Sequence, residues 1–180
     1  MFSVKNILIA TSMLIPFSLH ASSNTETAGD IGQIAIPMFA LGTSLYKNDT
    51  EGFWEATKVI AITAGTTHLL KNTTGVLRPN GSNFQSFPSG HTSAAFSGAA
   101  FLHHRYGIEY GLPAYLAASY VGYSRCYANK HWQSDVLAGA VLAYTVSYFV
   151  TTEYNDPNLS IAPARFGNSD AQGITIQYKL

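Results

Sequence analysis

The sequence predicts an all-α fold: a helical bundle of five core helices, preceded by an N-terminal signal or first membrane helix. Apolar segments long enough for helices recur along the 180-residue chain, and Pro and Gly bound several of them. Charged residues make up only 11% of the chain, against roughly 25% in an ordinary soluble domain. The length is enough for one domain rather than two.

Residues 1–23 have the composition of an export signal. Lys5 precedes an apolar run over residues 7–17, and small residues follow at positions 21–23. This order of charge, apolar core and small residues is typical of a secretory signal peptide. An uncleaved membrane helix is the alternative interpretation, and both place residue 24 onward outside the cytoplasm.

Residues 24–152 are expected to form the helical domain, which opens with a polar stretch over residues 24–30. The expected helices cover residues 31–46, 53–70, 92–103, 112–121 and 136–150. A long loop is expected over residues 72–87, which are rich in Asn, Gly, Ser and Pro. Long loops inside compact domains are usually functional or disordered.

Residues 153–180 are expected to form a C-terminal tail. Asp156–Pro157 and Ala162–Pro163 are expected to break regular structure. Apolar and polar side chains then alternate over residues 174–180, which is the period of a strand. One strand cannot close a barrel, so an edge strand, a lipid contact and a disordered end are the open interpretations.

Charge and cysteine content restrict the function. Ten Lys and Arg balance ten Asp and Glu, so no basic surface is expected and nucleic acid is not an expected partner. Cys126 is the only cysteine, which excludes an intramolecular disulfide and a cysteine metal cluster. The predicted helices lie near the lower limit of roughly 17 apolar residues for a membrane span. A membrane protein and a soluble helical domain are therefore both consistent with them.

Residues 124–135 contain a histidine and a carboxylate at a spacing suited to nucleophilic catalysis. Ser124 and Arg125 are followed by His131 and, four residues later, by Asp135. On one helix face, the carboxylate could accept a hydrogen bond from one imidazole nitrogen and leave the other with a free lone pair. An imidazole held in this way is a competent nucleophile. An exposed ion pair is the alternative interpretation of these two residues alone.

The motif Pro88-Ser89-Gly90-His91 stands at the start of a predicted helix. Ser89 can cap that helix, and Gly90 allows a close approach of the backbone to a ligand. Free N–H groups at a helix start bind anions, and His91 could give a proton to a leaving oxygen there. An ordinary helix cap with an incidental histidine is the alternative.

Lys71 and Arg78 lie in a third motif, Lys-x6-Arg-Pro, and add to the charge of Arg125. Three cations suit a phosphoryl group, whose charge during transfer spreads over three equatorial oxygens. Three solvated surface cations are the alternative interpretation. The sequence holds no cluster of Asp and Glu suited to Mg²⁺, so neither a metal nor another cofactor is expected.

Together the motifs resemble the three-part signature of the type 2 phosphatidic acid phosphatase superfamily, and in particular its membrane lipid phosphatase branch. Every fixed position of Lys-x6-Arg-Pro, Pro-Ser-Gly-His and Ser-Arg-x5-His-x3-Asp is present, in order, within residues 71–135. The resemblance in helix order covers about residues 31–150. With the N-terminal run counted as a span, the order of helices and motifs matches the membrane branch, which favours the membrane interpretation.

The resemblance implies a role for each motif residue. His131 attacks phosphorus and becomes a phosphohistidine, Asp135 orients it, and His91 protonates the leaving oxygen. Ser124 is given only a positioning role. The phosphoryl oxygens are held by Lys71, Arg78, Ser89, Gly90 and Arg125.

The resemblance also implies the activity: metal-independent hydrolysis of phosphomonoesters or pyrophosphates at the periplasmic face of a bacterial inner membrane. Expected substrates are phosphatidic acid, phosphatidylglycerophosphate, an isoprenyl pyrophosphate and lipid A. The alternatives are a soluble periplasmic non-specific acid phosphatase, a vanadate-dependent haloperoxidase and a binding protein with a degenerate site. The intact signature argues against a binding protein, and a haloperoxidase is expected in a larger chain.

Overall fold

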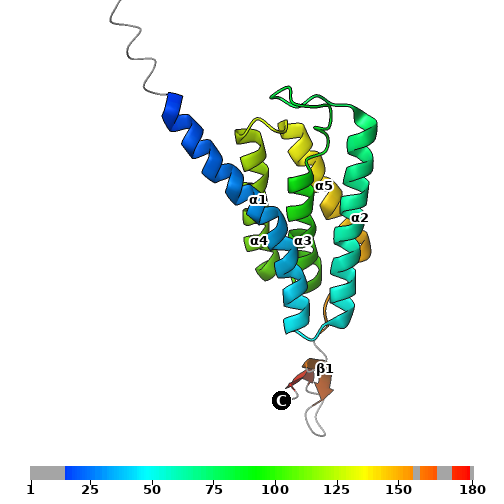
Figure 1. Ribbon diagram of the computed structural model, residues 1–180. Coiled ribbons are helices and arrows are strands. Elements are labelled where there is room, and N and C mark those ends of the chain that lie inside the picture. The colour runs from blue at the N-terminus through cyan, green and yellow to red at the C-terminus, as the bar shows by residue number, and fades with distance from the viewer. Residues whose placement is uncertain (1–14, 156–158, 166–171, 179–180) are drawn as a thin grey trace, which may run out of the picture.

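The computed structural model describes residues 15–155, 159–165 and 172–178 of the chain. Within these ranges five helices form the body of the molecule, which confirms the predicted all-α bundle (Figure 1). The helices are α1 (Ile15–Tyr46), α2 (Thr50–Thr74), α3 (Gly90–Tyr106), α4 (Ile108–Tyr127) and α5 (Gln133–Val150).

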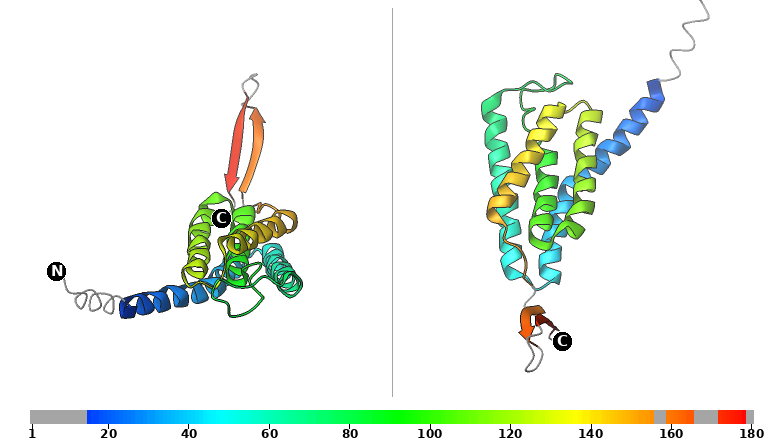
Figure 2. Two further views of the ribbon diagram at one scale, coloured as in Figure 1. Left: turned by 90° about the horizontal axis from the view of Figure 1, so that it is seen from above. Right: turned by 180° about the vertical axis from the view of Figure 1, so that it is seen from behind.

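Helix α3 is the centre of the bundle and packs against the other four helices (Figure 2). Its sequence suits this position because Ala95, Ala99 and Ala100 are completely buried and leave little space between helices. At Gly98, a Cβ atom would lie 2.8 Å from the backbone of Pro37 in α1. A larger residue there would therefore push α1 away from α3.

Helix α1 is longer than the sequence predicts. It continues without a break through residues 24–30, where a polar segment is expected before the first core helix. Two acidic side chains of that segment, Glu26 and Asp30, contact Lys130 and Arg125, so the polar stretch belongs to a packed helix. Most of the expected N-terminal signal or membrane helix, residues 1–14, lies outside the described residues.

The tail forms an antiparallel hairpin of β1 (Leu159–Arg165) and β2 (Gln172–Tyr178). The strand period is thereby confirmed over residues 174–178, and residues 179–180 lie outside the described residues. The expected break at Ala162–Pro163 is wrong, because these residues lie within β1, with Pro163 opposite Ile174. A two-stranded ribbon has two edges, where a proline without an N–H is tolerated. The hairpin extends from the bundle end opposite the long loop before α3 (Figure 2).

The sides of the bundle expose many large apolar side chains. In α1 these are Ile31, Ile34, Met38, Phe39 and Leu45, and in α5 they are Leu137, Val141, Tyr148 and Phe149. No helix of the described residues contains a stretch that is both long and apolar enough to cross a bilayer.

Candidate active site

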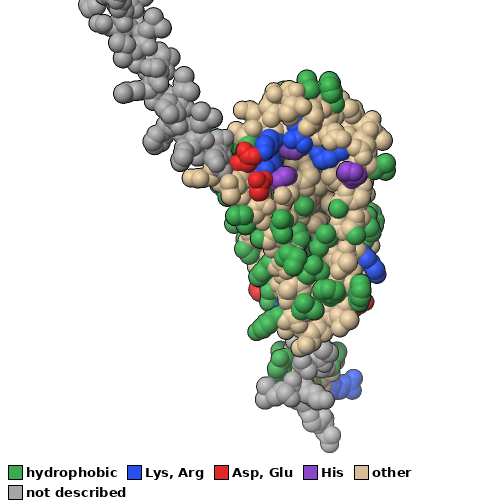
Figure 3. All heavy atoms as spheres, in the orientation of Figure 1, with side chains coloured by type: hydrophobic (Ala, Val, Ile, Leu, Met, Phe, Trp, Pro, Cys, Tyr) green, Lys and Arg blue, Asp and Glu red, His purple; other side chains and the backbone are tan. Residues whose placement is uncertain are grey.

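The three motifs meet at the bundle end that carries the long loop between α2 and α3. Figure 3 shows charged and histidine side chains gathered on one patch at this end, and few of them on the rest of the face in view. Lys71 lies in the last turn of α2, His91 in the first turn of α3, and Arg125 in the last turn of α4. His131 lies between α4 and α5.

The loop that carries Arg78 is folded against the loop after α4. Helix α2 ends at Thr74, and Gly75, with a positive φ of 61°, caps it and turns the chain out of the helix. The Arg78 N–H then donates to the Asn83 carbonyl at 3.0 Å. Trp132 Nε1, next to His131, donates to the carbonyl of Leu77 at 2.9 Å. These bonds bring the first and third motifs together.

Ser89 caps α3, as the sequence predicts. Its buried hydroxyl accepts hydrogen bonds from the N–H of Thr92 at 3.4 Å and from the Thr92 hydroxyl at 2.9 Å. The Ser89 N–H donates to the carbonyl of Asp135 at 3.0 Å. Helix α5 can approach this closely because of Gly139, where a Cβ would lie 2.8 Å from the Ser89 carbonyl oxygen. The second and third motifs are therefore in direct contact.

His131 and Asp135 are adjacent, but not in the predicted way. They do not share a helix face, because α5 begins at Gln133 and His131 precedes it. The Asp135 carboxylate instead caps α5 by accepting from the Trp132 N–H at 2.9 Å, and it accepts from the Ser86 hydroxyl at 2.5 Å. His131 Nδ1 lies 3.6 Å from Asp135 Oδ2 and has no hydrogen-bond partner among the described residues. The expected hydrogen bond between the two is absent.

The electrostatic environment keeps His131 neutral. Burial lowers its pKa to about 4, and the charges of Lys71 and Arg78 act in the same direction against the opposing charge of Asp135. Burial also lowers the pKa of Lys71 to about 8, and the Arg78 charge adds to this. Arg78 Nε is buried without a partner in the described part of the chain. A neutral imidazole thus lies beside cations whose charge is not fully met, which suits an anionic ligand.

Arg125 is fully buried and is held by α1 as well as by its own helix. Its Nε donates to the Ser124 hydroxyl at 2.9 Å, and one Nη donates to the Glu26 carbonyl at 2.6 Å. The other Nη donates to Asp30 Oδ1 at 2.7 Å, and the same oxygen lies 2.9 Å from His91 Nε2. Sequence reasoning missed Asp30, although Glu26 and Asp30 are the only charged residues between positions 24 and 46.

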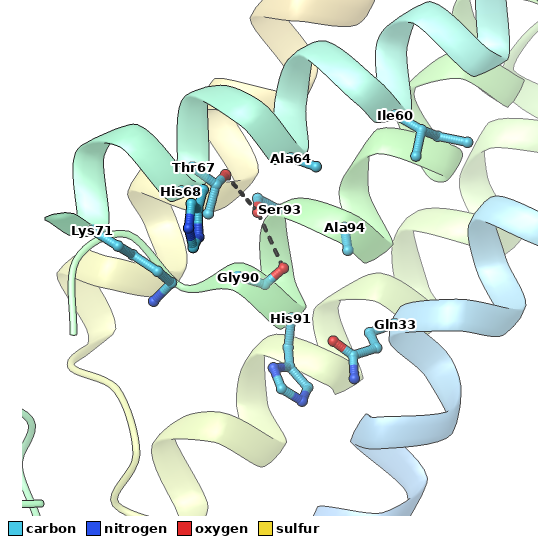
Figure 4. A pocket seen from close by; sticks show the side chains of 10 residues that line it. All are labelled: Gln33, Ile60, Ala64, Thr67, His68, Lys71, Gly90, His91, Ser93 and Ala94. Atoms are coloured by element: carbon cyan, nitrogen blue, oxygen red, sulfur yellow. Dashed lines mark hydrogen bonds between the residues drawn. The ribbon is translucent and has the colours of Figure 1, made fainter. Parts of the chain in front are cut away.

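A cavity of about 290 Å³ opens beside His91 and Lys71, between α1, α2 and α3. Its residues are shown in Figure 4, where Lys71 and Ile60 lie at opposite ends. The wall away from the charged groups is apolar and includes Ile60, Ala64 and Ala94. The cavity therefore joins a cationic end to an apolar end.

The fold and the motifs both agree with a known family of enzymes. The structure of LpxE from Aquifex aeolicus superposes with a TM-score of 0.63, at 22% identity, over 72% of this chain and 84% of that chain. This likeness concerns the fold. The family model of the PAP2 superfamily matches residues 52–158, which contain all three motifs. The chain belongs to the PAP2 superfamily, and the resemblance stated from the motifs is confirmed at that level.

Two relatives are lipid A phosphatases. The chain is 33% identical over 127 residues to the lipid A 1-phosphatase of Porphyromonas gingivalis, a match that covers 65% of this chain and 28% of that protein. It is 27% identical over 168 residues to the lipid A 4'-phosphatase of Helicobacter pylori, which covers 86% of this chain and 84% of that protein. The chain thus spans little more than a quarter of the first relative and most of the second.

Proposed function

We propose that this protein is a phosphatase that hydrolyses phosphorylated membrane lipids through a phosphohistidine intermediate on His131. The observation that carries the proposal is the meeting of the three motifs around a buried, neutral imidazole flanked by Lys71 and Arg78. A neutral imidazole is the nucleophilic form, and cations beside it favour a phosphoryl group. The similarity to two lipid A phosphatases makes lipid A the first substrate to test.

The first chemical step transfers the phosphoryl group to His131. Nδ1 faces Asp135 at 3.6 Å, so we assign the attack on phosphorus to the other ring nitrogen, Nε2. The bond between phosphorus and the ester oxygen breaks, and His91 gives a proton to the departing oxygen. Asp135 stabilises the positive charge that forms on His131. The phosphoryl oxygens are bound by Lys71, Arg78, Ser89, Gly90 and Arg125.

The second step regenerates the enzyme. A water molecule attacks phosphorus, the P–N bond to His131 breaks, and His91 takes a proton from the water. Phosphate then leaves the cationic end of the site. The two steps use groups of this protein and one water molecule, and the proposed reaction includes no metal.

The substrate and location are part of the same proposal. Apolar side chains exposed on α1 and α5 would contact lipid, and the apolar wall of the cavity would take the apolar part of a lipid substrate. The export-signal composition of residues 1–23 supports a site that faces the periplasm, at the bacterial inner membrane.

The test is phosphate release from detergent-dispersed lipid A in the presence of a chelator. Wild type should release phosphate, and His131→Ala should lose on the order of 10⁴-fold or more in rate. His103→Ala, which removes a histidine at the other end of α3, is the matched control and should keep full activity. Acid-labile, alkali-stable labelling of the protein by a radioactive phosphate ester should appear in wild type only.

Two results would redirect the proposal. Equal release by wild type and His131→Ala would show that His131 is not the nucleophile. Hydrolysis of small water-soluble esters at the same rate as lipid would support the non-specific acid phosphatase alternative instead.

A further inference from the structure

A single carboxylate oxygen joins two motif residues of the site. Asp30 Oδ1 lies 2.9 Å from Nε2 of His91 and accepts a hydrogen bond from Arg125 at 2.7 Å. These two residues belong to the second and third motifs, whereas Asp30 belongs to none of the three. The contact therefore ties α1 to the proposed proton donor.

The position of Asp30 is set by close packing between α1 and α4. At Gly29, a Cβ atom would lie 2.0 Å from the Ser124 hydroxyl and 2.5 Å from Nη2 of Arg125. At Gly32, a Cβ would lie 2.6 Å from Val121 of α4. Only glycines allow α1 to come this close, so the carboxylate is held by a fitted helix contact and not by a mobile side chain alone.

Charged and titratable side chains from three helices and one loop surround His91. These groups are Asp30 from α1, His68 and Lys71 from α2, Arg125 from α4 and Lys130 from the loop after α4. Burial lowers the pKa of His91, and the charges of Arg125 and Lys130 act in the same direction. Asp30 raises this pKa through both its hydrogen bond and its charge. Among these groups, Asp30 is the one that favours the protonated form of His91.

We propose that Asp30 is a positioning residue of the active site, which fixes the orientation and tautomer of His91 and stabilises its protonated form. With Nε2–H committed to Asp30, only Nδ1 can give a proton to the leaving oxygen and later take one from water. The site then contains two His–Asp pairs, one for the nucleophile and one for the proton donor. This inference rests on the proposed phosphatase function.

The predicted consequence is a dependence on the leaving group. Aryl phosphates have leaving groups that need little protonation, whereas alkyl phosphates need a proton from the enzyme. Asp30→Asn keeps the shape and a hydrogen-bond acceptor but removes the charge. We expect kcat for an alkyl phosphate to fall by roughly 10- to 100-fold and kcat for an aryl phosphate to fall by less than about 3-fold. The alkaline limb of the kcat profile should also move to lower pH, because His91 then loses its proton more easily.

Glu26→Gln is the matched control. Glu26 lies one turn before Asp30 on the same helix and forms an ion pair with Lys130. Its loss should leave the ratio of alkyl to aryl hydrolysis as in wild type. Asp30→Glu, which restores the carboxylate, should recover part of the alkyl activity. Thermal melting of each variant shows that the compared proteins are folded.

A measurement without turnover separates this inference from the proposed function. The ¹⁵N shifts of the His91 ring in detergent-solubilised protein should show the Nε2–H tautomer in wild type, and a lower pKa of His91 in Asp30→Asn. If the shifts behave in this way but wild type hydrolyses no ester, the phosphatase proposal fails and the Asp30–His91 pair stands.

Other outcomes overturn the inference while leaving the phosphatase proposal intact. An equal loss for alkyl and aryl esters would show that Asp30 only holds α1 in place. A gain in activity with a lower KM in Asp30→Asn would show that the carboxylate competes with the substrate for Arg125. An unchanged His91 pKa in Asp30→Asn would exclude the proposed stabilisation of the proton.

Discussion

Each end of the bundle buries an arginine, and the two ends differ in how many carboxylates bind the guanidinium group. At the far end, Arg105 donates to both carboxylate oxygens of Asp49 at 2.6 and 2.7 Å, and to Glu55 at 3.4 Å. It also donates to the carbonyl and hydroxyl of Thr152 and, at 3.4 Å, to Glu51. At the site end, Arg125 meets one carboxylate, Asp30, and shares that oxygen with His91.

The comparison shows which end is prepared for a ligand. The cluster around Arg105 is closed, since carboxylates of the protein itself surround the cation. At the site end, Arg78 Nε and His131 Nδ1 are buried without partners among the described residues, and the pKa of Lys71 is lowered to about 8 by burial and by Arg78. Charge left over in a buried cluster is unfavourable in the free protein and favourable once an anion is bound.

Arg105→Met should remove the ion pairs of the closed end and have the largest effect on stability of the variants considered. It leaves Asp49 and Glu55 buried without their cation, so we expect a loss of about 3–5 kcal/mol in the free energy of unfolding. Activity per folded molecule should be unchanged, as measured by thermal melts and by kcat on the remaining folded fraction.

Glu51→Gln is the control for this prediction. Its carboxylate is 3.4 Å from Arg105, but its side chain is 72% exposed, so its removal should change stability by less than about 1 kcal/mol. A loss of activity in Arg105→Met without a loss of stability would show that the far end serves the site.

Arg78→Met, at the site end, should lower activity and leave stability unchanged, which is the reverse of the result expected for Arg105→Met. We expect kcat/KM to fall by about 10²- to 10³-fold, as for the loss of one group that stabilises transition-state charge. Stability should hold or rise slightly, because the change removes a cation from a cluster with excess positive charge. A clear fall in the melting temperature, measured beside kcat, would contradict the view that this end is prepared for an anion.

Local sequence information was enough for the bundle and for the three motifs of the candidate site. Helical segments depend on apolar content and on Pro and Gly at their ends, and these are visible in the chain. The cap at Ser89 follows from residue type alone. The motif residues could be named because their chemical types and spacings are specific.

What could not be predicted depends on contacts between helices. Asp30 reaches His91 only because α1 crosses α4 at Gly29. The place where two helices cross cannot be predicted from the periodicity of a short sequence segment. The cap at Asp135 was missed for a similar reason. A spacing of four suggests a helix pair with His131, but whether α5 starts before or after the histidine is decided by packing.

The acid limb of the pH profile depends on the cations at the site end of the bundle. Because the pKa of His131 is about 4, kcat/KM should begin to fall only near pH 4, and not near the usual histidine value of about 6.5. Folding stability responds in the same direction but over a higher pH range. The unfolded chain takes up the proton at about pH 6.5 and the folded chain only near pH 4, so this residue makes stability fall as pH drops through that window.

Profiles of kcat/KM and of melting temperature against pH check both statements. In Lys71→Met, the loss of one neighbouring cation should raise the pKa of His131 and move the acid limb to higher pH. An acid limb near pH 6.5 in wild type would show that the cations do not lower the pKa of His131, the proposed nucleophile.

The smallest expected effect concerns Lys71 itself. Its pKa of about 8 means that it loses its charge above that pH, so KM should rise there while kcat changes less. Arg stays charged throughout this range, and Lys71→Arg should abolish the rise in KM, at a loss of a few-fold in kcat/KM near neutral pH from altered geometry. Lys58→Arg, at an exposed position on the same helix, should reproduce the wild-type profile. If KM rises equally in wild type and Lys71→Arg, the alkaline effect belongs to another group, and Lys71 binds phosphate without titrating in this range.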